Sequence, residues 1–261
     1  FLAVLVYAIG QGDEEARHVG FHPVYLTLVA GVCMALLTGD LFNLFVAFEV
    51  LLVSSYVLLT LGGRLAQVRA GTTYVVISLL ASITFLMSLG LLYRATGTVN
   101  LADLPAAMEA LDPELRRVFL LLFLGVFGIK AAIFPLFFWL PDSYPNAPTA
   151  ITAVFAGLLT KVGVYAMIRI QTTIGPDDTV VGTVLLVVAA LTMVIGVFGA
   201  ISQQEIKRIL SFHAVSQIGY MVFGLGLLTV AGLAAAILYI AQYIVVKTTL
   251  FLTGGLVERA S

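Results

Sequence analysis

The chain has 261 residues, of which 61% are hydrophobic and 10% charged, with a formal net charge of −1 and a mean hydropathy of +1.10. Soluble domains usually carry about 25% charged residues, and a chain of this length cannot bury so much apolar surface in water. The composition therefore predicts a membrane protein. The small net charge gives no support for nucleic-acid binding, and the single cysteine, Cys33, excludes an internal disulfide.

Apolar runs divide the chain into one partial span and eight full spans. The partial span is 1–10, and the full spans are expected at 23–38, 41–62, 71–93, 118–140, 147–170, 179–201, 209–229 and 231–257. Most of them reach the ~20 residues needed to cross the hydrocarbon core. Because a backbone in lipid must satisfy its hydrogen bonds internally, these spans are expected to be helices. The long connection at 94–117 is expected to hold a short amphipathic surface helix or to be a solvated connector.

The distribution of basic residues predicts the orientation, because cytoplasmic loops carry more Lys and Arg. One side of this topology collects Arg17, Arg64, Arg69, Lys207, Arg208 and Arg259. The other side collects Arg94, Arg116, Arg117 and Arg169. The bias places the first set in the cytoplasm.

Four ionisable residues lie deep inside apolar runs. They are Glu49 and three of the four lysines in the chain, Lys130, Lys161 and Lys247. Each such charge costs at least ~2.5–3.5 kcal/mol on insertion scales, so that four together approach the ~5–15 kcal/mol net stability of a typical fold. A purely structural chain would be expected to avoid them.

Two interpretations of these residues remain open. Static ion pairs that fasten helices together would suit one Glu with one Lys, for instance Glu49 with Lys130, but not three lysines with one deep acid. A proton relay is favoured, because a lysine removed from water can gain and release a proton near neutral pH.

The span that contains Lys130 also contains a predicted helix break. Pro135 follows five residues later, and proline removes a helix hydrogen bond and clashes with the preceding turn. A broken helix beside a buried lysine leaves carbonyls that can hold water or ions. A plain proline kink is the alternative.

Several further polar residues have weaker assignments. His213 lies about one turn inside its span and is either a proton relay or a packing histidine. Tyr239 and Tyr243 precede Lys247 by eight and four residues, so they share its helix face and either hydrogen-bond it or pack. Asp40 is expected to cap a helix, and Asp142 to cap the segment after the break. The sequence contains no metal-binding Cys pair, phosphate-binding Gly loop or nucleophile elbow, so no cofactor or metal is predicted.

Three long runs resemble one known family. They are TGDLFNLFVAFEVLLVSSYVLLTLGG, GIKAAIFPLFFWLPDSYPNAPTAITAVFAGLLTKVGVYAMIRI and KRILSFHAVSQIGYM. In this order they resemble the antiporter-like subunits shared by respiratory complex I and Mrp cation/proton antiporters, most closely the D-subunit family of Mrp complexes. Members of that family are considerably longer, so the chain is expected to be their middle portion.

The resemblance implies an all-α polytopic bundle with inverted repeats and a Pro-broken helix. The first repeat would cover about 23–170, and the second would begin at about 179–261. By this resemblance Glu49 matches the family's membrane glutamate, and Lys130 the lysine on the broken helix that pairs with it. Lys161 and Lys247 match the lysines that continue the polar axis. Where several relatives have a histidine four residues before the last lysine, this chain has Tyr243.

The sequence and the resemblance together predict a proton-translocating subunit of a multi-subunit Na⁺(K⁺)/H⁺ antiporter in a bacterial plasma membrane. Protons would pass along Glu49, Lys130, Lys161 and Lys247, and the other subunits of the complex would be the partners. The first alternative is a proton-pumping subunit of an NADH:quinone oxidoreductase or a membrane hydrogenase. The second is a structural scaffold held by static ion pairs.

Overall fold

The structure, a computed structural model, describes residues 1–11, 20–175 and 177–260. The first half of the described chain contains α1 (Leu2–Gln11), α2 (Phe21–Leu37), α3 (Leu41–Thr60), α4 (Leu65–Thr96), α5 (Leu104–Glu109) and α6 (Pro113–Ala131). The second half contains α7 (Trp139–Ser143), η1 (Tyr144–Asn146), α8 (Thr149–Val154), η2 (Phe155–Leu159), α9 (Thr160–Ile174), α10 (Thr179–Ile201), α11 (Ile206–Gly226) and α12 (Val230–Ala260).

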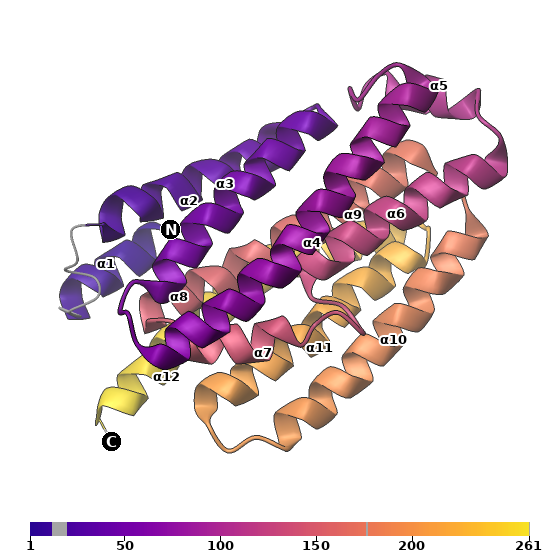
Figure 1. Cartoon of the computed structure of the whole chain (residues 1–261). Coiled ribbons are helices and arrows are strands. Elements are labelled where there is room, and N and C mark those ends of the chain that lie inside the picture. The colour runs from indigo at the N-terminus through magenta and orange to yellow at the C-terminus, as the bar shows by residue number, and fades with distance from the viewer. Residues whose placement is uncertain (12–19, 176, 261) are drawn as a thin grey trace.

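The long helices form one bundle with roughly parallel axes (Figure 1). The pair α2 and α3 lies at one edge and the pair α10 and α11 at the other, and α4, α6 and α9 lie between them. Helices α8, η2 and α9 follow one another without a gap, and they form the most buried apolar span of the bundle. In contrast, α10 and α12 expose most of their apolar residues. Helices this long and apolar, with so many apolar residues outside the core, are typical of membrane spans, and the prediction of a helical membrane bundle is confirmed.

Most predicted spans correspond to single helices, and the span predicted at 179–201 has the bounds of α10. Within the described residues, six helices are long and apolar enough to cross a membrane. The other two predicted spans correspond to α2, which has 17 residues, and α6, which carries charged residues near both ends.

Two predicted boundaries were wrong. The span expected at 118–140 begins earlier, because Asp112 caps α6 by accepting a hydrogen bond from the Glu114 N–H at 2.8 Å. The same span ends at Ala131 instead of continuing to residue 140. The surface helix expected within 94–117 is therefore only the six residues of α5.

Glycines allow the closest helix contacts, as expected for membrane bundles. A Cβ added to Gly196 of α10 would lie 2.7 Å from Cα of Ser216 on α11. A Cβ added to Gly224 of α11 would lie 2.8 Å from the carbonyl oxygen of Gly232 on α12. The backbones therefore meet at these positions, and a larger residue would separate the helices.

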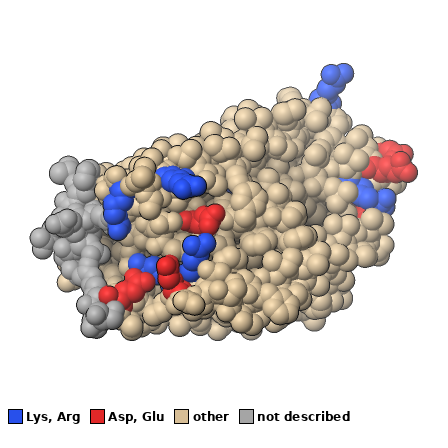
Figure 2. Space-filling view, turned by 60° about the horizontal axis from the view of Figure 1, so that its bottom comes forward, with Lys and Arg blue, Asp and Glu red and all other residues tan. Residues whose placement is uncertain are grey.

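Charged side chains gather towards the two ends of the molecule and leave an apolar belt between them (Figure 2). At one end, Lys207 Nζ lies 2.8 Å from Glu258 Oε2, and Arg208 Nη2 lies 3.6 Å from Asp142 Oδ1. Asp142 therefore binds α11 from within α7, and it is not the helix cap that was predicted. Arg64 and Lys207 line the same surface pocket, which agrees with their assignment to one side of the membrane. Arg17 and His18 lie outside the described residues.

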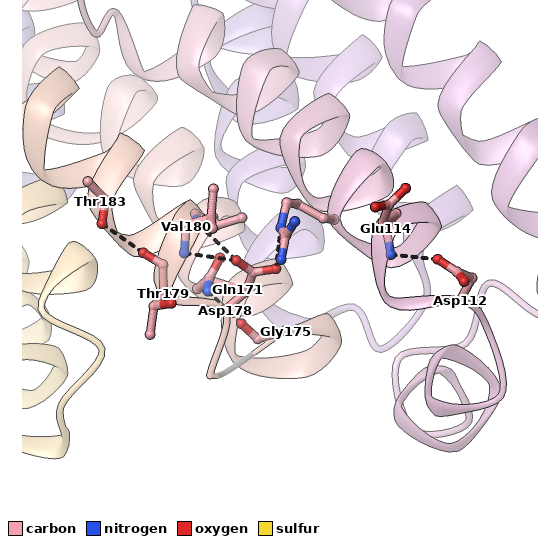
Figure 3. Close-up of polar contacts among 10 residues, drawn as sticks. Asp112, Glu114, Gln171, Gly175, Asp178, Thr179, Val180 and Thr183 are labelled. Atoms are coloured by element: carbon pink, nitrogen blue, oxygen red, sulfur yellow. Dashed lines mark hydrogen bonds and ion pairs between the residues drawn. The ribbon is translucent and has the colours of Figure 1, made fainter.

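An ion pair at the opposite end joins α6 to the start of α10 (Figure 3). Arg117 Nε donates to Asp178 Oδ2 at 2.9 Å, while Asp178 Oδ1 accepts from the N–H groups of Val180 and Val181 at 3.0 and 3.1 Å. Burial alone would raise the pKa of Asp178, but the hydrogen bonds from Val181 and Arg117 outweigh it and lower this pKa below its ordinary value.

We expect this end of the bundle to lose stability in acid. Because the pKa of Asp178 is lower in the folded state, its ionised form adds stability that is complete above the unfolded value of ~3.9. This contribution decreases as the pH falls through the lower, folded value. Thermal unfolding of wild type and Asp178→Asn between pH 3 and 7 would measure it. Equal differences in melting temperature across that whole range would contradict the expectation.

Candidate functional site

The break after α6 is stabilised by one local hydrogen bond and by hydrogen bonds from residues farther along the chain. Ala132 adopts the left-handed conformation, with φ of 62°, and its N–H donates to the Ile129 carbonyl at 3.2 Å. The Trp139 indole donates to the same carbonyl at 3.0 Å, and the Phe134 N–H donates to Thr192 Oγ1 of α10, also at 3.0 Å. The helix therefore ends four residues before Pro135. A break near Lys130 is present as predicted, and it falls in the turn before Pro135, where the proline ring would clash with a continued helix.

Lys130 is the penultimate residue of α6 and points towards α4. Its Nζ donates to the Ser78 carbonyl at 3.2 Å and to Ser82 Oγ at 3.3 Å, and it lies 5.8 Å from the centre of the Phe48 ring. The carbonyl end of a helix also favours a positive charge. The ammonium group therefore has several partial negative charges around it. Among the described residues no carboxylate lies within 4.0 Å of it, and Glu49 attracts it from a longer distance.

A cavity of about 30 Å³ adjoins Lys130 and is also lined by Tyr74, Ser78 and Trp139. A cavity can hold one water when about 10–15 Å³ of it is open to the centre of a water molecule. The cavity can therefore accept one or two waters in contact with the ammonium group.

Glu49 lies on α3, one residue after Phe48, and is half-buried. Its Oε1 is buried and has no hydrogen-bond partner among the described residues. Within the same residues, no ion pair as short as 4.0 Å joins Glu49 to Lys130. The two predicted partners are therefore on neighbouring parts of the bundle, but they are not in contact in this structure.

Lys161 lies at the start of α9, and only 2% of it is exposed. It lies two residues after the π-helical turn η2, in which the Ala156 carbonyl accepts a hydrogen bond from Lys161 Nζ. Thr160 Oγ1 lies 3.1 Å from the same nitrogen. A π-helical turn within an α-helix is uncommon and often marks a functional position, and here it supplies the acceptor for a buried cation.

Lys247 lies on α12 and is fully buried. Its Nζ lies 3.0 Å from His213 Nδ1 of α11, and the Tyr243 hydroxyl lies 3.3 Å from the same ring nitrogen. A neutral histidine with its proton on Nε2 would accept at Nδ1, so this geometry favours that tautomer. His213 is therefore a direct neighbour of the buried lysine, and Tyr243 bonds to His213 instead of to Lys247.

The structure brings Lys161 and Lys247 together beside Tyr243. Lys130 bonds to α4, and Glu49 lies on α3 without contacting it. Four parts of the site were not predicted from sequence: the π-helical turn, Ser78, Ser82 and Thr160. Ser82, a hydroxyl within an apolar span, was the one side-chain signal for a Lys130 partner, because Ser78 contributes only its backbone carbonyl. A backbone carbonyl partner such as that of Ala156 has no sequence signal.

Fold and site together define a polytopic helical membrane protein with cationic side chains inside its spans. The family model described as "NADH:quinone oxidoreductase/Mrp antiporter, TM" matches residues 38–261. The chain therefore belongs to this family, and it is a multi-pass protein of a bacterial plasma membrane.

Two curated relatives are named as the D-type subunits of Na(+)/H(+) antiporters. The one from Alkalihalophilus pseudofirmus is 49% identical over 257 residues, which are 98% of this chain and 52% of the relative. The one from Bacillus subtilis is 40% identical over 256 residues, which are 97% of this chain and 52% of the relative. The chain thus spans about half the length of these relatives, and the resemblance to the D-subunit family of Mrp complexes is confirmed.

Two solved complexes contain chains with the same fold. A chain of the Mrp complex from Dietzia sp. DQ12-45-1b has a TM-score of 0.83 and 43% identity, over 88% of this chain and 44% of that one. A chain of the archaeal membrane-bound sulfane sulfur reductase has a TM-score of 0.80 and 30% identity, over 88% of this chain and 47% of that one. The antiporter-like bundle expected from the sequence is confirmed.

Proposed function

We propose that the chain is part of a proton-translocating subunit of a multi-subunit Na⁺(K⁺)/H⁺ antiporter. It would act as a secondary transporter subunit and not as an enzyme, with the other subunits of the complex as its partners. The names of the relatives and the match to an Mrp complex support this assignment.

The relay in this proposal passes through Glu49, Lys130, Lys161 and Lys247, with His213 beside the last lysine. The observation that carries it is the environment of the three lysines. Each is held inside a span by a carbonyl, a hydroxyl or a ring nitrogen, and a neutral amine can still donate to these acceptors, although more weakly than an ammonium group. A lysine held in this way can change its protonation state without breaking an ion pair.

Glu49 and Lys130 would serve as the switch of the relay. Two groups that interact strongly titrate as a pair, so moving them apart changes the protonation of both. In this structure Lys130 bonds to α4 and does not contact Glu49, and a switch of this kind would have such an arrangement as one of its two positions. In this proposal the first repeat covers about 23–170, and the second begins at about 179–261.

The structure offers little support for a scaffold of static ion pairs. Within the described part of the chain, no carboxylate lies within 4.0 Å of Lys130, Lys161 or Lys247. The ion pairs that join helices lie near the ends of the bundle instead, at Arg117–Asp178 and Lys207–Glu258.

A proton-pumping subunit of a redox complex is the second candidate function. It is favoured by the likeness to a chain of the sulfane sulfur reductase, a respiratory membrane complex. The buried residues would play the same part in both functions, because only the partner chains would differ. The higher identity to antiporter subunits favours the first candidate.

A transport measurement on the complete complex separates the two candidates. The full-length subunit would be expressed with its complex in a host that lacks its own antiporters, and everted vesicles would be given an acidic interior. The antiporter predicts that added Na⁺ or K⁺ dissipates the pH gradient when no electron donor for the complex is present. Proton movement that does not depend on either cation and requires an electron donor would assign the chain to a redox complex.

A further inference from the structure

Tyr243 of α12 is adjacent to two buried lysines that come from different helices. Lys161 Nζ of α9 lies 4.9 Å from the centre of its ring, and Lys247 Nζ lies 5.7 Å from the same point. The tyrosine is itself buried, with 3% of its surface exposed. Its hydroxyl lies 3.3 Å from His213 Nδ1. One side chain therefore contacts both lysines and the histidine.

The face of the Tyr243 ring supplies the partial negative charge that a carboxylate would otherwise give to the lysines. An aromatic face attracts a cation within about 6 Å of its centre, and it does so more strongly when water is excluded. Two ammonium groups beside one ring also repel each other strongly in a medium of low dielectric constant. The arrangement therefore stabilises one positive charge well and two charges poorly.

The titratable groups around Tyr243 come from three helices. They are Lys161 of α9, His213 of α11, and Lys247 and Tyr239 of α12. Tyr239 stacks on Tyr243 with ring centres 5.7 Å apart, and its own hydroxyl bonds to Gln217. Within the described residues, none of the groups in contact with the Tyr243 ring is an acid.

We propose that Tyr243 is a positioning residue that couples Lys161 to Lys247, so that the two lysines share a single positive charge across its ring. A proton that arrives at one lysine then favours release from the other. The proposal rests on the relay proposed above.

The test compares substitutions that keep or remove the ring, in the complete complex and at matched assembly. Tyr243→Phe keeps the aromatic face and removes only the hydroxyl, so exchange is expected to stay within about threefold of wild type. Tyr243→Leu removes the face that stabilises an ammonium group at either lysine. We expect its exchange rate to fall roughly tenfold, and its half-maximal exchange to move to lower pH by about one unit, given the strength of a desolvated cation–π contact.

Phe251 provides a matched control, because its ring lies 5.6 Å from Lys247 Nζ alone. Phe251→Leu is expected to shift the pH profile less than Tyr243→Leu does. If Tyr243→Leu does not assemble, Tyr243→Met carries the same expectation with a more adaptable side chain.

The outcomes separate this proposal from the relay itself. Lys161→Ala and Lys247→Ala are measured in the same vesicles. If these two abolish exchange while Tyr243→Leu keeps the rate and pH profile of wild type, the coupling role of Tyr243 is wrong and the relay stands. If both lysine variants exchange at the wild-type rate, the relay and the coupling role are both overturned.

Discussion

Replacing Lys247 by alanine is expected to reduce cation-dependent proton exchange by roughly a hundredfold or more, the range typical for loss of a positioned proton-transfer group. Lys247 is fully buried, and His213 Nδ1 is its only hydrogen-bond partner among the described residues. Alanine cannot carry the proton, and the relay would then lack its group between Lys161 and the rest of α12. Everted vesicles that contain the complete complex would give the rate, with subunit assembly quantified in the same membranes.

Lys207→Ala is the matched control for this prediction. Lys207 lies at one end of the bundle, where its Nζ pairs with Glu258 at 2.8 Å. A pair near the surface contributes only about 0–1 kcal/mol, so exchange is expected to stay close to wild type. Equal losses in the two variants would show that lysine removal acts through general destabilisation, and would contradict the special role of Lys247.

Gly163→Ala is expected to destabilise the junction between α6 and α9. A Cβ at this position would lie 2.7 Å from the Ala131 nitrogen, 2.9 Å from the Lys130 carbonyl carbon and 3.0 Å from the Ala131 Cα. These are backbone atoms, so they cannot turn aside as a flexible side chain would. Overpacking of this kind costs about 1–3 kcal/mol, and moving the end of α6 would also displace Lys130. Thermal unfolding and vesicle exchange are both expected to show a loss.

Gly125→Ala on α6 is the control for the helix effect of alanine. No atom lies within 4 Å of a Cβ added there, and alanine gains up to about 1 kcal/mol over glycine within a helix. The control is therefore expected to be neutral or slightly stabilising. A Gly163→Ala protein with the same melting temperature as this control would show that α9 does not pack as closely on α6 as described.

The number, type and order of the spans could be predicted from sequence, because hydropathy records directly which segments lipid must cover. The exact residue at which the helix ends could not. Alanine is the strongest helix former, so the residue type at position 132 gives no sign of a helix end, and Pro135 indicates only the turn before it. The bonds that fix the break come from Trp139 and from Thr192, which is 58 residues away from Phe134. The proline therefore indicates the region of the break, and tertiary contacts determine the residue at which the helix ends.

The candidate site was predictable in its charged residues and not in their neighbours. Lysines within apolar runs are visible in any hydropathy profile, because each has a large insertion cost. The acceptor for Lys161 is a backbone carbonyl in a π-helical turn, and the acceptors for Lys130 lie on α4, about 50 residues earlier. The meeting of Lys161 with Tyr243 depends on how α9 and α12 pack, which no local pattern encodes.

The most direct test of the proposed relay uses the pair at its start, Glu49 and Lys130. Cation-dependent dissipation of the pH gradient would be measured in everted vesicles that contain the complete complex, with wild type, Lys130→Ala and Glu49→Gln compared at matched assembly. We predict that both variants assemble and lose exchange. Exchange at the wild-type rate in either assembled variant would contradict the relay, and would show that these buried charges are structural.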